Sequence, residues 1–212
     1  MRTIFPNKKA LIDQYIHAGN RVLDVGFSGQ GVQKESPNWP HALLKNKGAE
    51  VWGVDLEIDR GSFPNTERYQ EESAESFSFP EKKFDVIFAG DLIEHLPNPG
   101  LFLTSCAKHM EKGSNLIITT PNCFNLFNLA EKITKDEPTV NHDHTAYFNH
   151  KTLTKLLEKR GFKVVSIGYI YSLEYTHKES WKKRILNVLY WITSLITPKY
   201  IETLVVVAKS AT

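Results

Sequence analysis

Short apolar runs rich in valine and isoleucine recur along the chain, and each ends in or beside Gly, Asp, Asn or Pro. Four of them begin at residues 22 (VLDVG), 50 (EVWGVDLE), 84 (FDVIFAGD) and 115 (NLIITTPN). A segment that could hold a helix separates each run from the next, so this alternation predicts a parallel sheet with helical crossovers. Two later runs, at 163–170 and 203–210, predict two more strands.

The segments between these runs predict helices around residues 6–18, 39–47, 97–111 and 151–160. The last of them has leucines at helical spacing, basic residues near its end and Gly161 as a stop. By contrast, residues 121–150 have no clear period and carry Pro, Asn and His. They predict a long connection, and long ordered loops in compact domains are usually functional.

Residues 179–196 combine apolar side chains at helical spacing with a basic cluster near their start, made of Lys182, Lys183 and Arg184. The pattern predicts an amphipathic helix, within a helical insertion at 171–200 before the last strand. This helix packs on the sheet edge or on a second copy of the chain, or else it contacts a lipid or a lipid-linked ligand at a membrane surface.

Length and composition narrow the class of protein. The chain has 212 residues, and we expect a single domain over 1–212. A formal net charge of +2 is too small to indicate nucleic acid as a partner. No apolar run reaches the length of a membrane span. The first residues lack the apolar stretch of a secretory signal, so we expect a cytoplasmic protein with Cys106 and Cys123 as free thiols.

The stretch RVLDVGFSGQG, residues 21–31, places an acid and three glycines at the end of the first predicted strand. In an open parallel sheet, ligands bind beyond the carboxyl ends of the strands, where the strand order reverses. A Walker-type phosphate loop needs a lysine and a hydroxyl after its last glycine, and Val32 and Gln33 stand there instead. The dinucleotide spacing G-x-G-x-x-G is absent too. The Asp24 carboxylate would repel a pyrophosphate and suits a cationic or hydroxyl-bearing ligand.

A second acid closes the next run. Asp55 ends VWGVD, where a carboxylate reaches the ribose hydroxyls of a bound nucleoside. Asp24 and Asp55, without a phosphate-binding lysine, fit an adenosine-type cofactor that carries no phosphates. S-adenosylmethionine is such a cofactor, and its amino group and sulfonium are positive. The alternative is that both acids only cap turns.

Five segments together, VLDVGFSGQG, VWGVD, FDVIFAGDLIEHLPNPGLFL, LIITTPN and DHTAYFNHKTLTKLLEKRGF, resemble class I S-adenosylmethionine-dependent methyltransferases. The resemblance points to a branch often found with cell-surface glycan genes. It implies an α/β, Rossmann-like, doubly wound sheet of seven strands, mostly parallel with an antiparallel last strand. By this resemblance, Asp24 and Gly26 lie at the base of a turn around the methionine part of the cofactor. Asp55 and Leu56 also bind the cofactor, and 121–150 covers the acceptor side.

The chain departs from the family's pattern at two places. The usual turn is D-x-G-x-G-x-G, but Ser28 stands at the second glycine, so that Gly29 or a later glycine must supply flexibility. The family often has an Asp-Ala pair whose Asp meets the adenine amino group. The pair here is Ser73-Ala74, and the Ser73 hydroxyl or neighbouring Glu72 would accept that hydrogen bond.

Methyl transfer is an in-line displacement at a sulfonium carbon, so the enzyme mainly has to align the acceptor with the methyl group. If the acceptor is a hydroxyl, an imidazole suits the removal of its proton. Histidines in the relevant regions are His41, His95, His142 and His144. We favour His144 as the base or a substrate contact, with Asp143 placed to orient an imidazole. His95 is a further candidate, or it fixes a turn by a structural hydrogen bond. Asp91 faces the cofactor or acceptor, or else caps a helix.

The sequence HDH at 142–144 also raises the question of a metal site. Two imidazoles and a carboxylate can hold a divalent ion, which lowers the pKa of a bound hydroxyl. His150 and Asp91 are only guesses for a third ligand, because neither stands at a clear spacing. We therefore expect no metal.

The resemblance implies that the methyl acceptor is an oxygen on a sugar or a related glycan precursor. One alternative is O-methylation of a quinone-like or other small aromatic metabolite, which the aromatic side chains of 121–150 would suit. Another is a non-catalytic protein of methyltransferase fold that serves as a partner in a complex, which the altered turn at Ser28 would permit.

Overall fold

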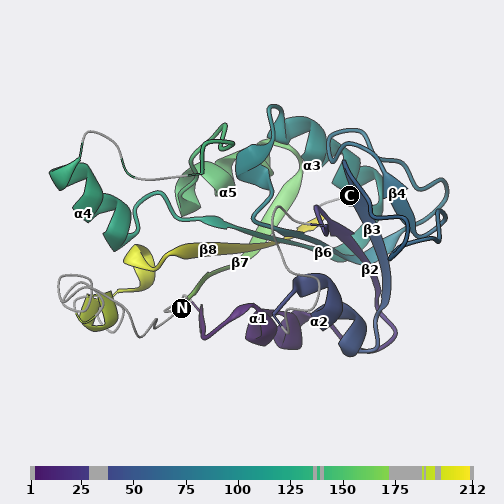
Figure 1. The fold of residues 1–212 in the computed structure, drawn as a ribbon, viewed down its shortest axis with the longest axis horizontal. Helices are drawn as coiled ribbons and strands as arrows, with labels where there is room; N and C mark the ends of the chain where they lie inside the picture. Colours follow the sequence, from purple (N-terminus) through teal and green to yellow (C-terminus); the bar gives the residue numbers. More distant parts are fainter. Residues whose placement is uncertain are drawn as a thin grey trace.

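The computed structural model describes residues 3–28, 38–135, 138, 141–171, 188, 190–193 and 197–210. Within these residues, eight strands form one sheet in the order β1-β7-β8-β6-β5-β2-β3-β4 (Figure 1). The strands are β1 (Thr3–Phe5), β2 (Arg21–Val25), β3 (Glu50–Asp55), β4 (Tyr69–Glu71), β5 (Phe84–Gly90), β6 (Met110–Pro121), β7 (Phe162–Ile170) and β8 (Thr203–Ser210). The helices are α1 (Lys8–Tyr15), α2 (Pro40–Asn46), α3 (Pro99–Lys108), α4 (Leu126–Thr134) and α5 (His150–Lys159), with 3-10 turns η1 (Ile93–His95) and η2 (Pro198–Tyr200).

The strand directions confirm a mostly parallel sheet with an antiparallel last strand. Strand β8 runs antiparallel to β6 and to β7, and every other neighbouring pair is parallel. The sheet has one strand more than the seven that we expected. The apolar runs located neither β1, which pairs with the edge of β7, nor β4, which pairs with β3, and each pairing covers three residues. A strand of three residues is too short to produce a periodic sequence signal.

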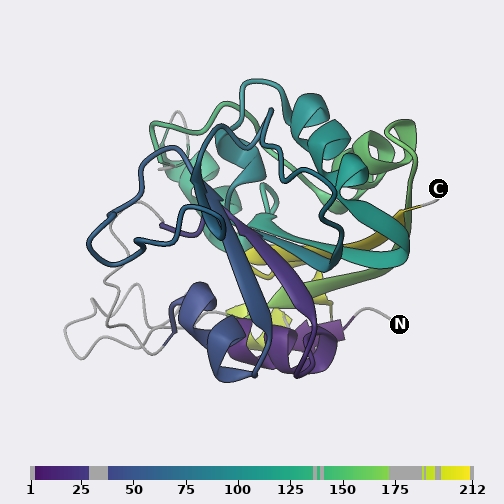
Figure 2. The same cartoon turned by 90° about the vertical axis from the view of Figure 1, so that its right-hand side faces the viewer.

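Helices cover both faces of the sheet, so that alternate residues of the central strands enter two separate cores. Val22 of β2 packs in the core beneath α1 and α2, whereas Leu23 packs in the core beneath α3 and α5. Figures 1 and 2 show α1 and α2 together on one face, and Figure 1 shows α3 and α5 on the other. Burial on both faces explains why these strands are nearly continuous apolar runs.

The four predicted helices are confirmed as α1, α2, α3 and α5; the first three are shorter than predicted, and α5 has the predicted length but begins one residue earlier. Residues 121–150, predicted as a connection, contain the additional helix α4. The Asn125 side chain caps it by accepting a hydrogen bond of 2.9 Å from the Asn128 N–H. No side chain of α4 is buried, and Ile133 is 86% exposed, because this helix projects beyond the end of the sheet (Figure 1).

The helix predicted at 179–196 lies mostly outside the described residues, although 188 and 190–193 are helical. Within it, Tyr190 is fully buried and its ring stacks on Tyr171, with 5.1 Å between the centroids. Its hydroxyl accepts a hydrogen bond of 2.9 Å from the Glu202 N–H, which ties this segment to the start of β8. No helix in the described part of the chain is long and apolar enough to cross a membrane.

The strand order reverses between β2 and β5, and this reversal positions the site. From β2 the chain proceeds outward through β3 and β4, then returns to β5 on the opposite side of β2 and continues to β6. The loops after β2 and β5 therefore diverge and leave a crevice at the carboxyl ends of the strands. Both loops carry residues that the sequence singles out, Asp24 with Gly26 and Asp91.

The first prediction concerns Gly53, whose missing side chain makes room for the turn after β2. A Cβ there would lie 2.6 Å from the Phe27 ring and 2.9 Å from the Tyr69 ring, both buried. We expect Gly53→Ala to lower the free energy of unfolding by about 1–3 kcal/mol, since it overpacks this contact. Gly61→Ala, in an exposed loop, is the control. Equal effects in urea unfolding would contradict this packing.

Candidate functional site

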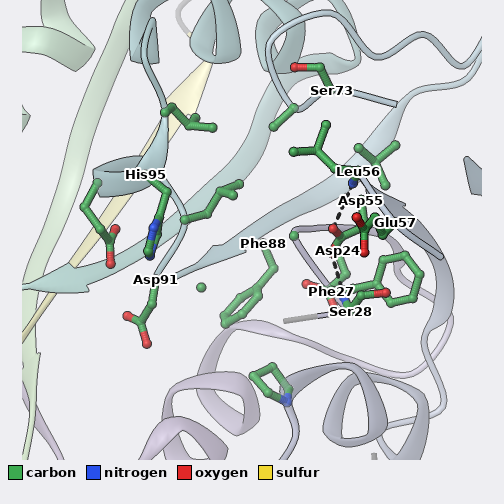
Figure 3. A pocket seen from close by; sticks show the side chains of 18 of the residues that line it. Asp24, Phe27, Ser28, Asp55, Leu56, Glu57, Ser73, Phe88, Asp91 and His95 are labelled. Carbon is green, nitrogen blue, oxygen red and sulfur yellow. Dashed lines mark hydrogen bonds between the residues drawn. The ribbon is translucent and has the colours of Figure 1, made fainter. Parts of the chain in front are cut away.

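A pocket of about 1360 Å³ opens at the carboxyl ends of the central strands (Figure 3). All the described residues that the sequence predicts for cofactor binding line it, namely Asp24, Gly26, Ser28, Asp55, Leu56, Ser73, Ala74 and Asp91. Gly29 lies outside the described residues. His95 and His144 line the same pocket, but Asp143 and His41 do not. The fold thus brings segments from five strand ends around one cavity.

Asp55 closes one side of the pocket and holds the turn that follows β2. Its Oδ2 accepts a hydrogen bond of 2.8 Å from the Ser28 N–H, and its Oδ1 accepts one of 2.8 Å from the Leu56 N–H. Burial raises the pKa of Asp55, while these backbone donors act in the opposite direction. Asp55 ends β3, the strand next to β2, and a carboxylate at that position of such a sheet is placed to bind ribose hydroxyls.

Asp24 is buried beneath the turn, where it is paired with a histidine. The Asp24 Oδ2 lies 3.0 Å from His41 Nδ1, and His41 Nε2 lies 3.2 Å from the Tyr69 hydroxyl. Asp24 is 3% exposed and His41 is 1% exposed. Both ring nitrogens of His41 are engaged, so this histidine is a structural partner of Asp24 and not a group that meets the acceptor.

An aromatic cluster holds the turn in which a serine replaces the family's second glycine. The Trp39 indole N–H donates a hydrogen bond of 2.8 Å to the Phe27 carbonyl. Phe27, Trp39, His41, Phe63 and Tyr69 contact one another, with ring centroids 4.8–6.0 Å apart. Gly26 keeps a left-handed conformation at φ +77°. Side chains from distant segments therefore fix this turn, which a local glycine motif could not reveal.

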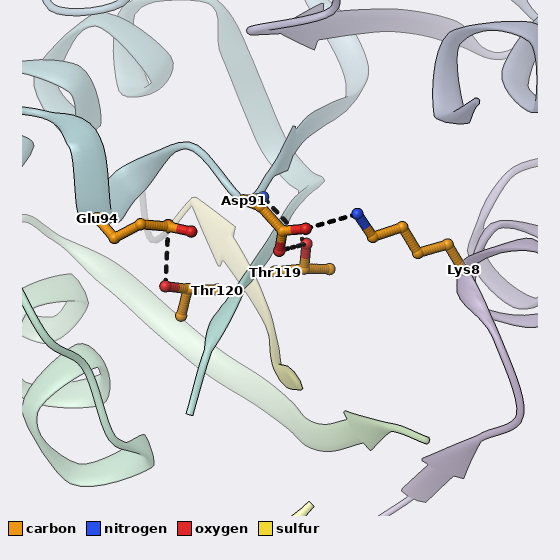
Figure 4. A network of polar contacts seen from close by, with 5 residues as sticks. All are labelled: Lys8, Asp91, Glu94, Thr119 and Thr120. Atoms are coloured by element: carbon orange, nitrogen blue, oxygen red, sulfur yellow. Dashed lines mark hydrogen bonds and ion pairs between the residues drawn. The ribbon is translucent and has the colours of Figure 1, made fainter. Parts of the chain in front are cut away.

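Asp91 lies across the pocket from Asp55 and is paired with a lysine (Figures 3 and 4). Its Oδ2 forms an ion pair of 2.6 Å with Lys8 Nζ, and its Oδ1 accepts a hydrogen bond of 2.8 Å from the Thr119 hydroxyl. The alternative role as a helix cap is wrong, because Leu92 is the N-cap of η1 and that turn has no side-chain cap. Lys8, from the first helix, was not predicted as part of the site.

Three polar side chains gather beside Asp91, and one of them, Glu94, was missed by the sequence analysis. Glu94 is 2% exposed, and its Oε2 accepts a hydrogen bond of 2.9 Å from the Thr120 hydroxyl (Figure 4). Burial, and then the Asp91 charge, raise the pKa of Glu94 to about 7. The only sequence signal was an acid directly before His95.

His95 and His144 complete this group of polar side chains. Their rings meet edge to face with 4.7 Å between the centroids, and burial lowers the pKa of His144. His95 Nδ1 is buried and has no hydrogen-bond partner among the described residues, so the ring does not fix the turn through that atom. The Asp143 carboxylate lies 3.2 Å from Nε2 of the exposed His142, so the imidazole that it contacts is that of His142.

Comparisons with known proteins identify the family of the chain. Residues 3–167 match the family described as methyltransferase domain. The chain is 30% identical over 154 residues to a ubiquinone biosynthesis O-methyltransferase of Vibrio cholerae, covering 66% of this chain and 60% of that protein. The corresponding protein of Coxiella burnetii is 29% identical over 185 residues, covering 81% of this chain and 76% of the relative. The chain thus spans about 60% of the length of the Vibrio relative.

Solved structures show the same fold. A SAM-dependent methyltransferase from Archaeoglobus fulgidus superposes with a TM-score of 0.63 at 22% identity, over 96% of this chain and 93% of that one. A 1,6-didemethyltoxoflavin-N1-methyltransferase from Burkholderia thailandensis, with S-adenosylhomocysteine bound, superposes with a TM-score of 0.61 at 17% identity, over 96% and 76%. The chain therefore belongs to the family of methyltransferase domains and has the fold of S-adenosylmethionine-dependent methyltransferases.

Proposed function

We propose that this protein is an S-adenosylmethionine-dependent O-methyltransferase that acts on a hydroxyl of a small aromatic, quinone-related acceptor. One observation carries the proposal: a single pocket joins the Asp55 carboxylate, the Lys8–Asp91 ion pair and the polar group around Glu94. The relatives described above are named for ubiquinone biosynthesis. They favour the aromatic acceptor over the sugar that the sequence resemblance implied.

The two ends of the cofactor match the two sides of this pocket. Asp55 binds the ribose hydroxyls, and the adenine lies toward Ser73 and Ala74. The methionine tail carries one ammonium and one carboxylate. The ion pair offers a negative group, Asp91, for the ammonium and a positive group, Lys8, for the carboxylate. On binding, Asp91 takes the ammonium and Lys8 takes the carboxylate, so two new charge-assisted bonds replace the original one.

The acceptor lies on the far side of the methyl group, where Glu94, His95 and His144 line the pocket. Its oxygen attacks the methyl carbon in line with the sulfur, and the carbon–sulfur bond breaks as the carbon–oxygen bond forms. S-adenosylhomocysteine leaves with the electron pair of that bond. The acceptor hydroxyl loses its proton to the Glu94 carboxylate as the carbon–oxygen bond forms.

The ribose assignment predicts that Asp55→Asn weakens every ligand that carries adenosine. We expect calorimetry to give at least a tenfold loss of affinity for S-adenosylhomocysteine, about 1.4 kcal/mol, because a neutral amide replaces a charged acceptor. Glu67→Gln, an exposed change outside the pocket, should leave the affinity unchanged. No binding by the unaltered protein at millimolar ligand would overturn the proposed function and favour a non-catalytic partner.

The tail assignment predicts a different outcome for Lys8→Gln. This variant should bind S-adenosylhomocysteine about tenfold more weakly, since it loses a charge-assisted bond to the carboxylate. It should bind methylthioadenosine as the unaltered protein does, because that ligand lacks the amino acid. Equal losses for both ligands would show that Lys8 acts on the fold of the site and not on the tail.

The acceptor assignment is tested by transfer of labelled methyl from S-adenosylmethionine to catechol and to a monosaccharide. We expect catechol to be methylated and the sugar to remain unlabelled. Glu94→Gln should lower the rate on catechol about 100-fold or more while S-adenosylhomocysteine affinity stays within twofold, and Glu158→Gln, on the exposed face of α5, should change neither. Methylation of the sugar alone would refute the aromatic assignment.

A further inference from the structure

Ser28 stands in the turn after β2, at the position where the family's pattern has its second glycine. Its Oγ is buried and makes no hydrogen bond within the described part of the chain. A buried hydroxyl without a partner is costly, and nearly all such groups in folded proteins find one. Ser28 also lines the pocket, so a bound ligand can supply the partner that the hydroxyl lacks.

The backbone of Ser28 holds this side chain beside Asp55. The Ser28 N–H donates a hydrogen bond of 2.8 Å to Asp55 Oδ2, and Figure 3 shows both residues on the same side of the pocket, away from Asp91 and His95. The residue as a whole is half-buried, and a serine side chain turns about a single bond between staggered positions. The hydroxyl can therefore turn from its buried position toward a ligand group that is bound to Asp55.

The Asp55 carboxylate has little capacity left for a diol. An ionised carboxylate offers about four acceptor sites. The Ser28 and Leu56 N–H groups each donate a hydrogen bond of 2.8 Å to it. Burial raises the pKa of Asp55, and the Glu57 N–H acts in the opposite direction as a third backbone donor, after those of Ser28 and Leu56. About one site therefore remains, whereas a ribose presents two hydroxyls on neighbouring carbons.

We propose that the ribose diol of the cofactor is shared at this corner of the pocket, with one hydroxyl on the Asp55 carboxylate and its neighbour on the Ser28 hydroxyl. The inference rests on the proposed function, because the ligand is the adenosine part of S-adenosylmethionine. A serine hydroxyl suits the second position, since it both donates and accepts. The residue that departs from the family's pattern thus adds a contact to the ligand that a glycine cannot make.

The test is calorimetric titration of the full chain with S-adenosylhomocysteine and with its 2′-deoxy and 3′-deoxy forms. Both deoxy forms should bind the unaltered protein more weakly, because each lacks one hydrogen bond. Ser28→Ala should bind S-adenosylhomocysteine about three- to tenfold more weakly. It should bind one of the deoxy forms as the unaltered protein does, because that form lacks the hydroxyl that Ser28 contacts. The other deoxy form should show the full loss.

Two further variants separate this contact from an effect on the turn. Ser28→Ala keeps the N–H that bonds to Asp55, and Ser28 is not among the described residues with a left-handed backbone, so neither alanine nor glycine strains it. Ser28→Gly, which restores the family's residue, should give the same pattern over the three ligands. The matched control is Ser73→Ala, on the adenine side of the same pocket, which should change all three affinities by one common factor.

An equal loss for all three ligands in Ser28→Ala would overturn the inference, because the hydroxyl would then contact another part of the ligand or support only the turn. Unchanged affinity for all three would overturn it as well. In both cases S-adenosylhomocysteine still binds the unaltered protein, and the proposed function stands. If the unaltered protein does not bind S-adenosylhomocysteine, the proposed function fails and this inference fails with it.

Discussion

The site depends on the parallel pairing of β2 with β3 on one side and β5 on the other. Because the chain leaves β2 in one direction and returns on its other side, the loops after β2 and β5 separate at the carboxyl ends of the strands. That geometry places Asp55 on one side of the pocket and Asp91 on the other. Apolar burial on both faces of the sheet stabilises this arrangement, so the positions of the charged groups follow from the core.

The turn after β2 shows how a departure from a family's pattern is accommodated. With Ser28 in place of a glycine, the backbone there is held by the aromatic rings around Phe27 and by the Asp55 carboxylate. The buried contact between Asp24 and His41 adds a second support beneath it. Tertiary contacts therefore hold the turn, and a count of its glycines does not reveal them.

Much of this arrangement could be predicted from the sequence, and the features that could not be predicted have identifiable physical reasons. Strand runs and acids at strand ends are local signals, so the sheet, the main helices and the lining of one pocket by Asp24, Asp55 and Asp91 were predictable. The strands β1 and β4 are each three residues long, which is too short for a periodic pattern, and the helix α4 buries no side chain. Glu94 and Lys8 line the pocket only because the chain folds their segments against it, so no local sequence pattern marks them. The long connection after β6 likewise gave no sign that Asp143 contacts His142.

The most direct test of the account is a crystal structure of the protein with S-adenosylhomocysteine. We predict the ribose hydroxyls at Asp55, the amino acid tail between Lys8 and Asp91, and the sulfur facing the side of the pocket that holds Glu94 and His144. A cofactor bound in the opposite direction, with its adenine at Asp91, would contradict the account. Crystals grown with S-adenosylhomocysteine whose pocket contains no ligand would also contradict it.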